Sequence, residues 1–219
     1  MKVRRLGRFP YPDAWALQAK LVNDRADGKI SDTLLIVEHN PVYTMGRKSP
    51  EFREERVPEN IHDVPVYLVE RGGETTYHGP GQLVIYPIFE LSPDFGPKAF
   101  LRLLEESIIH TLAGLGLAYT YWMEGQTGVW LDTPSGQRKI ASLGIAVKRN
   151  VSYHGLALNL TTDLNYFQEI RPCGFSPEVM TSVARETGKK FSIEFVADRL
   201  CVEIENRFRG RTREVLHAI

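Results

Sequence analysis

Four β-rich runs with short connections lie in the second half of the chain, and they restrict the fold more than any other feature. They cover residues 118–122, 127–131, 140–148 and 151–160. Pro134-Ser135-Gly136 predicts a tight turn between the second and third runs. A mixed or antiparallel sheet is therefore expected here, with helices packed against it.

Helical patterns lie on both sides of this region. Between Lys98 and Leu115, large aliphatic residues recur at spacings of three or four, and glycines end the pattern. A second helix is predicted over Glu194 to Phe208 with Ser192 as its N-cap, and a third opens at Pro12. Further strands are predicted over 33–38, 66–70 and 83–89. Residues 47–64 carry nine charged side chains and predict a solvated loop.

The whole pattern predicts an α+β fold: one mixed or antiparallel sheet flanked by helices. The chain has 219 residues, and no repeat or flexible linker divides it. We therefore expect a single domain over 1–219.

Composition excludes several classes of function. Lys and Arg number 27 against 27 Asp and Glu, and a net charge of zero argues against nucleic-acid binding. No apolar run is long enough to cross a membrane. The basic N-terminus has no apolar region before Pro10, so no signal peptide is expected. Two cysteines are too few for a disulfide scaffold, and a cytoplasmic protein is expected.

A glycine-rich segment, RGGETTYHGPGQ at 71–82, separates two of the predicted strands. It matches neither the dinucleotide-binding pattern nor the P-loop. Glycine clusters often only turn the chain. The density of Arg, Tyr, His and Gln in this one favours a ligand site.

Two other segments remain open on residue types alone. Lys139 begins a run of apolar and small residues, and a lysine at a strand start is usually exposed. Gly155 and Ala157 alternate with leucines in HGLALNL, which leaves a groove on one strand face. A packed helix or a ligand would fill such a groove equally well.

The two cysteines lie in different contexts. Cys173 lies between Pro172 and Gly174 on a predicted sharp loop, whereas Cys201 lies in the C-terminal helical pattern and predicts core packing. The six histidines are scattered and show no metal-binding spacing, so no metal is expected. A nucleophilic Cys173 with His78 or His154 as partner is compatible with the pattern.

Several segments taken together resemble the lipoyl (octanoyl) transferase family, from about Ile36 to Ser182. They are HNPVYTMGR (39–47), RGGETTYHGPGQLVIYPI (71–88), GVW (128–130), KIASLGIAVKR (139–149), HGLALNL (154–160) and PCGF followed by MTS (172–175, 180–182). The long glycine-rich string, K-I-A and a downstream P-C-G occur in the family's order. The resemblance implies the α+β fold shared with biotin and lipoate protein ligases.

The resemblance also implies an activity: transfer of an octanoyl group from acyl carrier protein to a lysine of a lipoyl domain. The family's catalytic dyad falls on Cys173 and Lys139. At a thiol pKa near 8.5 only roughly 3% is thiolate at pH 7, and a neighbouring ammonium increases that fraction. The family's substrate-binding stretches fall on Arg71, Gly72, Gly73, Glu74, Thr75, Thr76, Tyr77 and His78, on Ser142, Leu143 and Gly144, and on Gly155, Leu156 and Ala157.

The acceptors implied are lipoyl domains of 2-oxoacid dehydrogenase complexes and the glycine cleavage H protein, and no cofactor is expected. Three alternatives stay open. They are an ATP-dependent lipoate or biotin ligase, a non-catalytic acyl-binding domain, and a cysteine hydrolase using Cys173 with His78. Positive charge is uneven, and Lys148 with Arg149, beyond Lys139 on the same predicted strand, is one candidate surface for an acidic carrier.

Overall fold

The computed structural model describes residues 1–50, 58–170 and 176–217. Within these residues, seven strands form a large sheet of order β1-β2-β7-β11-β10-β9-β8. In that order their bounds are β1 Lys2–Arg8, β2 Thr33–Glu38, β7 Gln82–Ile88, β11 Val151–Asn159, β10 Gly136–Lys148, β9 Gln126–Thr133 and β8 Thr120–Met123. Only β1 and β2 pair in parallel, and the other neighbours are antiparallel.

A smaller sheet lies beside the large one, with order β4-β5-β3-β6. Its strands are β4 (Asn60–Ile61), β5 (Val64–Leu68), β3 (Val42–Met45) and β6 (Thr75–His78). The predicted fold class is confirmed. The sequence patterns predicted one sheet, however, and the structure has this second sheet as well.

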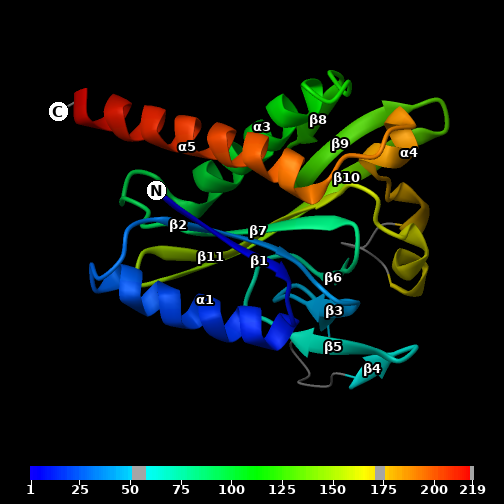
Figure 1. Ribbon diagram of the computed structural model, residues 1–219, viewed down its shortest axis with the longest axis horizontal. Helices are drawn as coiled ribbons and strands as arrows, with labels where there is room; N and C mark the ends of the chain where they lie inside the picture. Colours follow the sequence, from blue (N-terminus) through cyan, green and yellow to red (C-terminus); the bar gives the residue numbers. More distant parts are fainter. Residues whose placement is uncertain (51–57, 171–175, 218–219) are drawn as a thin grey trace.

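Helices cover both faces of the large sheet (Figure 1). On one face lie α3 (Pro97–Ala113) and α5 (Ile193–His217), which pack together over a core of aliphatic residues. On the other face lies α1 (Tyr11–Ala26), above a second core that includes Ala14, Val84 and Ala157. The strands between these layers are buried on both faces, which explains their continuous apolar sequences.

Short elements connect the two sheets. The 3₁₀ turns η1 (Leu164–Glu169) and η3 (Pro177–Val179) precede α4 (Val183–Thr187). A third core contains Tyr43, Tyr77, Phe167 and Met180, so η1 packs on the small sheet. The chain is thereby led from β11, past the small sheet, back to the large sheet.

Most predicted elements are confirmed, with shifted ends. The three predicted helices are α1, α3 and α5, although α5 continues well past Phe208. Ser192 caps α5 as predicted, since its Oγ accepts a hydrogen bond from Phe195 N at 3.2 Å. The turn at Pro134-Ser135 joins β9 to β10, and Gly136 adopts a φ of +110°. In the described part of the chain no helix is long and apolar enough to span a membrane.

Strands β1, β3, β4 and β6 were not predicted, and β4 lies inside the segment predicted as a solvated loop. β6 lies inside the glycine-rich segment, where closely spaced glycines indicated only a turn, and it pairs with β3. β1 carries four cationic side chains and lies mostly exposed at the sheet edge, so it has no apolar pattern to detect. Of the predicted charged loop at 47–64, residues 51–57 lie outside the described residues.

Candidate active site

Lys139 is fully buried, although a lysine at a strand start is usually exposed. It lies on β10 opposite Trp130 of β9, with its Nζ 5.2 Å from the centroid of the Trp130 ring. The β9–β10 pairing has an irregularity between Lys139 and Ala141. Bulges of this kind redirect side chains, often next to active sites.

Gly128 makes room for this side chain. Its φ is +141°, and a β carbon there would lie 2.4 Å from Lys139 Cε and 2.8 Å from Ala141 O. Only glycine combines this backbone conformation with so close an approach. Glu105 of α3 accepts a hydrogen bond from Gly128 N at 2.8 Å, which holds β9 against the helix at this point.

Beyond residue 141, β10 no longer pairs with β9, and the glycine-rich loop takes the place of that strand. Gly72 N donates to Ile145 O at 3.0 Å. The loop approaches so closely that a β carbon on Gly144 would lie 2.7 Å from Gly72 O. An opening therefore remains along the edge of β10, between the start of β9 and this loop.

Two cavities adjoin this opening. The wider one, of about 390 Å³, is lined by Lys48, Gly72, Gly73, Glu74, Leu101, Gly125, Gln126, Thr127, Lys139, Leu143, Gly144 and Ile145. The narrow one, of about 30 Å³, is lined by Tyr11, Arg71, Gly73, Thr76, His78, Tyr86, Ser142, Leu143, Gly144, His154, Gly155, Leu156 and Ala157. Both touch Gly73, Leu143 and Gly144, so they meet at the edge of β10.

A chain of buried hydrogen bonds connects the narrow cavity to the Lys139 backbone. His78 Nδ1 donates to Gln82 Oε1 at 2.7 Å, and Gln82 Nε2 donates to Asn159 Oδ1 at 2.9 Å. Asn159 Nδ2 donates to Thr181 O, and Thr181 N donates to Lys139 O at 3.0 Å. This arrangement assigns the His78 proton to Nδ1, because Gln82 uses its nitrogen for Asn159.

Neutral imidazoles and phenols surround the far part of the narrow cavity. Burial lowers the pKa of His78 to about 3 and that of His39 to about 4. His39 Nδ1 donates to Phe9 O, and the Tyr86 hydroxyl donates to His39 Nε2 at 2.8 Å. Tyr11 stacks on His78 with ring centroids 6.1 Å apart.

Arg71 is the cation of this cavity. Its guanidinium is buried and donates to Thr44 O, Thr44 Oγ1 and Gly72 O, at 2.6 to 3.2 Å. These bonds fix the start of the glycine-rich loop to β3. The glycine-rich segment is thus more than a turn: it forms a wall of the cavity, and Arg71 anchors it.

The structure brings most of the predicted substrate-binding residues together. All of Ser142, Leu143, Gly144, Gly155, Leu156 and Ala157 line a cavity, as do six of the eight residues at 71–78. Thr75 and Tyr77 line neither: Thr75 Oγ1 is 3.4 Å from Ser49 Oγ, and Tyr77 stacks on Tyr166 in the third core. The groove predicted beside Gly155 and Ala157 holds both α1 and the narrow cavity.

Of the two cysteines, the structure describes only Cys201. Cys173 lies outside the described residues. Cys201 is buried in α5 as predicted, and burial raises the pKa of its thiol to about 12. A buried thiol of this kind is unsuited to act as a nucleophile.

Reasoning from residue types missed several residues of the site, and four of them are instructive. Tyr11 precedes the predicted helix and Tyr86 lies in a predicted strand, and nothing in the sequence places them at a cavity. Gly128 was noticed only as part of the GVW motif, and nothing in the sequence indicates its contact with Lys139. Glu105 could have been noticed, because it falls among the aliphatic positions of α3, where a carboxylate is unexpected.

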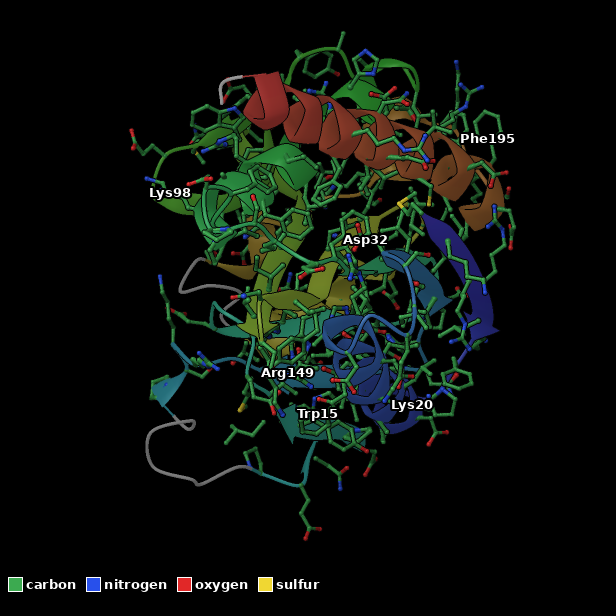
Figure 2. All side chains as sticks on the ribbon, turned by 90° about the vertical axis from the view of Figure 1, so that its left-hand side faces the viewer. Trp15, Lys20, Asp32, Lys98, Arg149 and Phe195 are labelled. Carbon is green, nitrogen blue, oxygen red and sulfur yellow. The ribbon has the colours of Figure 1, made fainter. Side chains whose placement is uncertain are left out.

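Arg149 lies far from Lys139. It pairs with Asp27, just beyond α1, at 2.7 Å, and Figure 2 shows it on the α1 side of the molecule. Nine residues of extended strand between Lys139 and Lys148 correspond to about 30 Å. Besides Lys139, the wider cavity is lined by Lys48, whose chain neighbour Arg47 is exposed.

Comparison with known proteins agrees with this geometry. The profile of the lipoyl protein ligase A/B catalytic domain family matches residues 10–205. An octanoyltransferase from Koribacter versatilis is 45% identical over 202 residues, which span 90% of this chain and 79% of that protein. One from Mycolicibacterium smegmatis is 42% identical over 213 residues, 96% of this chain and 90% of that protein. The chain belongs to the octanoyltransferase family.

Membership of this family makes the chain an acyltransferase, and the resemblance seen in the sequence is confirmed. Solved structures of the octanoyltransferases' wider fold group are more distant in sequence. A lipoate-protein ligase A bound with ATP has a TM-score of 0.68 at 18% identity, over 95% of this chain and 86% of the other. Biotin protein ligase from Aquifex aeolicus has a TM-score of 0.51 at 12% identity, over 96% and 70%. These structures show a shared fold. The reaction has to be inferred from the residues of the site.

Proposed function

We propose that this octanoyltransferase family member moves an octanoyl group from an acyl carrier protein to a lysine of a lipoyl domain, through a thioester on Cys173. One observation carries the proposal. The Lys139 side chain is buried and lines the wider cavity, which adjoins the narrow one at Leu143 and Gly144. A cation held there would face a reacting carbonyl group while the alkyl chain enters the narrow cavity.

The course of the chain supports a Cys173–Lys139 dyad. The segment after Cys173 returns to β10: Met180 bridges to Lys139 in parallel, and Thr181 N donates to Lys139 O. Met180 follows Cys173 by seven residues, which extended chain could span in about 25 Å at most. A tether of this length is compatible with contact between Cys173 and the buried lysine.

The chemistry balances with these two residues alone. The Cys173 thiolate attacks the octanoyl thioester, the carrier thiolate leaves, and the Lys139 ammonium protonates it. The amine of the acceptor lysine then attacks the acyl-cysteine and transfers a proton to Lys139. Amide formation releases the Cys173 thiolate and restores the ammonium. The energy of the thioester drives both steps, so no nucleotide is required.

The narrow cavity is the proposed site for the alkyl chain. Leu143, Leu156 and Ala157 provide apolar walls, and Gly144 and Gly155 leave space between them. Burial contributes about 0.8 kcal/mol per methylene, hence a few kcal/mol for an octanoyl chain.

The acceptors proposed are lipoyl domains of 2-oxoacid dehydrogenases and the glycine cleavage H protein. One structural neighbour, 17% identical, is described as an archaeal bipartite lipoate protein ligase with its E2 lipoyl domain. For the donor, an acidic carrier would meet Arg47 and Lys48 beside the wider cavity. We also propose a cytoplasmic location, because thiols stay reduced in that compartment.

An ATP-dependent ligase is the second candidate, because the structural neighbours include a lipoate ligase bound with ATP. The fold alone does not separate the two reactions. A ligase would require ATP to activate a free acid, whereas a transferase uses a thioester directly.

Intact-mass measurement after incubation with octanoyl-carrier protein, in EDTA and without ATP, tests the proposal. We expect one octanoyl adduct that is lost in Cys173→Ala and retained in Cys201→Ala, and that passes to added lipoyl domain. An adduct that survives Cys173→Ala contradicts the assignment of the nucleophile. Strict dependence on ATP would instead support the ligase.

A further inference from the structure

A buried carboxylate, Glu105, lies behind Lys139 and has no part in the mechanism above. Glu105 is only 3% exposed and lies on the buried side of α3. Burying a carboxylate is costly unless it is paired and hydrogen-bonded. Glu105 has two partners: Oε1 accepts from Gly128 N at 2.8 Å, and Oε2 accepts from Arg102 Nη1 at 2.7 Å.

The contact with Gly128 connects Glu105 to Lys139. The Cα of Gly128 faces the lysine so closely that its β carbon would lie 2.4 Å from Lys139 Cε and 3.1 Å from Nζ. The carboxylate therefore holds the piece of backbone that confines the ammonium. Arg102 completes the support, since its guanidinium stacks on Trp122 of β8, 3.0 Å from the ring centroid.

The second link is electrostatic. Burial raises the pKa of Glu105, while the Gly128 N–H and the charges of Arg102 and Lys139 act in the opposite direction. Lys139 is thus near enough to interact with the carboxylate. Other described charged groups around the pair are Glu106 of α3, and Lys48 and Glu74 across the wider cavity.

We propose that Glu105 is a positioning residue for Lys139: it anchors Gly128 over the lysine side chain and places a negative charge behind it. The inference rests on the proposed role of Lys139 in acyl transfer. It adds a residue on a different element, α3, to the support of the dyad. Removing only the charge of Glu105 should therefore change the reactivity of the Lys139 amine and leave the fold unchanged.

Glu105→Gln separates the two contributions, because the amide oxygen can still accept from Gly128 N while the charge is gone. Glu106→Gln is the matched control: it removes a carboxylate one residue away that pairs with Arg207. Trace acetylation with acetic anhydride at pH 8, read by peptide mass spectrometry, reports the free amine. Exposed Lys98 serves as the internal reference (Figure 2).

We expect Lys139 to be acetylated faster in Glu105→Gln, by up to about tenfold if one nearby charge is equivalent to about one pH unit. Glu106→Gln should change the rate much less, because that carboxylate is paired with Arg207. In octanoyl transfer, Glu105→Gln should lower kcat with little change in KM and shift the basic limb of the pH profile to lower pH. A purely structural glutamate would leave both the labelling and the pH profile unchanged, and that result overturns the proposal.

Arg102→Gln tests the same coupling with Glu105 intact. It removes a cation close to the carboxylate, so Lys139 should be acetylated more slowly than in the wild type. An unchanged rate would contradict the proposal even if Glu105→Gln failed to fold. Absence of octanoyl transfer by the wild type would refute the proposed function, whereas the labelling comparison would still decide the role of Glu105.

Discussion

Gly128 lies directly against the side chain of Lys139, and no other residue could occupy its position without displacing the lysine. A β carbon at residue 128 would meet Lys139 Cε at 2.4 Å and the backbone oxygen of Ala141 at 2.8 Å. The lysine could swing away, but the backbone of β10 could not. The position of the buried cation therefore depends on a glycine eleven residues earlier in the chain.

Gly128→Ala should lower both stability and activity. We expect a loss of about 2 kcal/mol or more, from backbone strain together with the clash with β10, and near-complete loss of transfer. Urea unfolding and a transfer assay on the folded fraction measure the two effects. Gly136→Ala is the control, since Gly136 also has a positive φ, +110°, but open space around it and no place in either cavity. Equal transfer rates in the two variants would contradict this account.

Lys139→Ala should slow alkylation of Cys173 by iodoacetamide at pH 7, because the thiolate loses its neighbouring cation. Transfer should fall by at least roughly 10²-fold if the lysine moves protons. Lys139→Arg should retain more of the alkylation rate but fail in transfer, since a guanidinium stays protonated. Identical alkylation in wild type and Lys139→Ala would place the activating cation elsewhere.

Ala157→Val should shift the acyl-chain preference. Ala157 lines the narrow cavity, so two added methyl groups shorten the space for the alkyl chain. Octanoyl transfer should fall several-fold relative to butanoyl transfer, measured with the two thioesters in parallel. Ala14→Val is the matched control, because Ala14 is buried in the same core but does not line the cavity. An unchanged preference in Ala157→Val would mean that the chain binds elsewhere.

Stability should fall between pH 7 and pH 5, and His78 should be one cause. Burial lowers the pKa of His78 to about 3, against 6.5 in the unfolded chain, so the unfolded state takes up the proton first as the pH falls. By pH 5 this costs about 2 kcal/mol. Urea unfolding of His78→Gln should show a correspondingly smaller loss. His62→Gln, at an exposed histidine, should behave as the wild type does; equal losses in all three would contradict the assignment.

Reversing the charges of Arg47 and Lys48 should weaken use of octanoyl-carrier protein, through a slower and less salt-dependent association. Lys148→Glu with Arg149→Glu, about 30 Å along the strand from Lys139, serves for comparison. Transfer from a small octanoyl thioester should be spared in the Lys148 and Arg149 variant, and in the Arg47 and Lys48 variant it should fall less than transfer from the carrier, because Lys48 also lines the wider cavity. A selective loss in the Lys148 and Arg149 variant would move the docking surface to the far end of β10.

The sequence by itself determined the three long helices, most strands of the large sheet and the family. Periodicity placed α1, α3 and α5, and continuous apolar runs placed β2, β7, β10 and β11, because helices and buried strands leave regular patterns of side chains. The ordered motifs around Lys139 and His78 identified the family, which the comparisons confirm. Cys201 was placed in the core for the same reason, as one member of an amphipathic helix.

Only the tertiary structure decided how these pieces form a site. The burial of Lys139 depends on the bulge in β10, on Gly128 and on Glu105 of α3, which come together only when α3 packs on the sheet. The narrow cavity exists because Arg71 anchors the glycine-rich loop to β3, and that loop replaces β9 beside β10. Such contacts join residues far apart in the chain, and their distances depend on packing, which no local pattern of residues encodes.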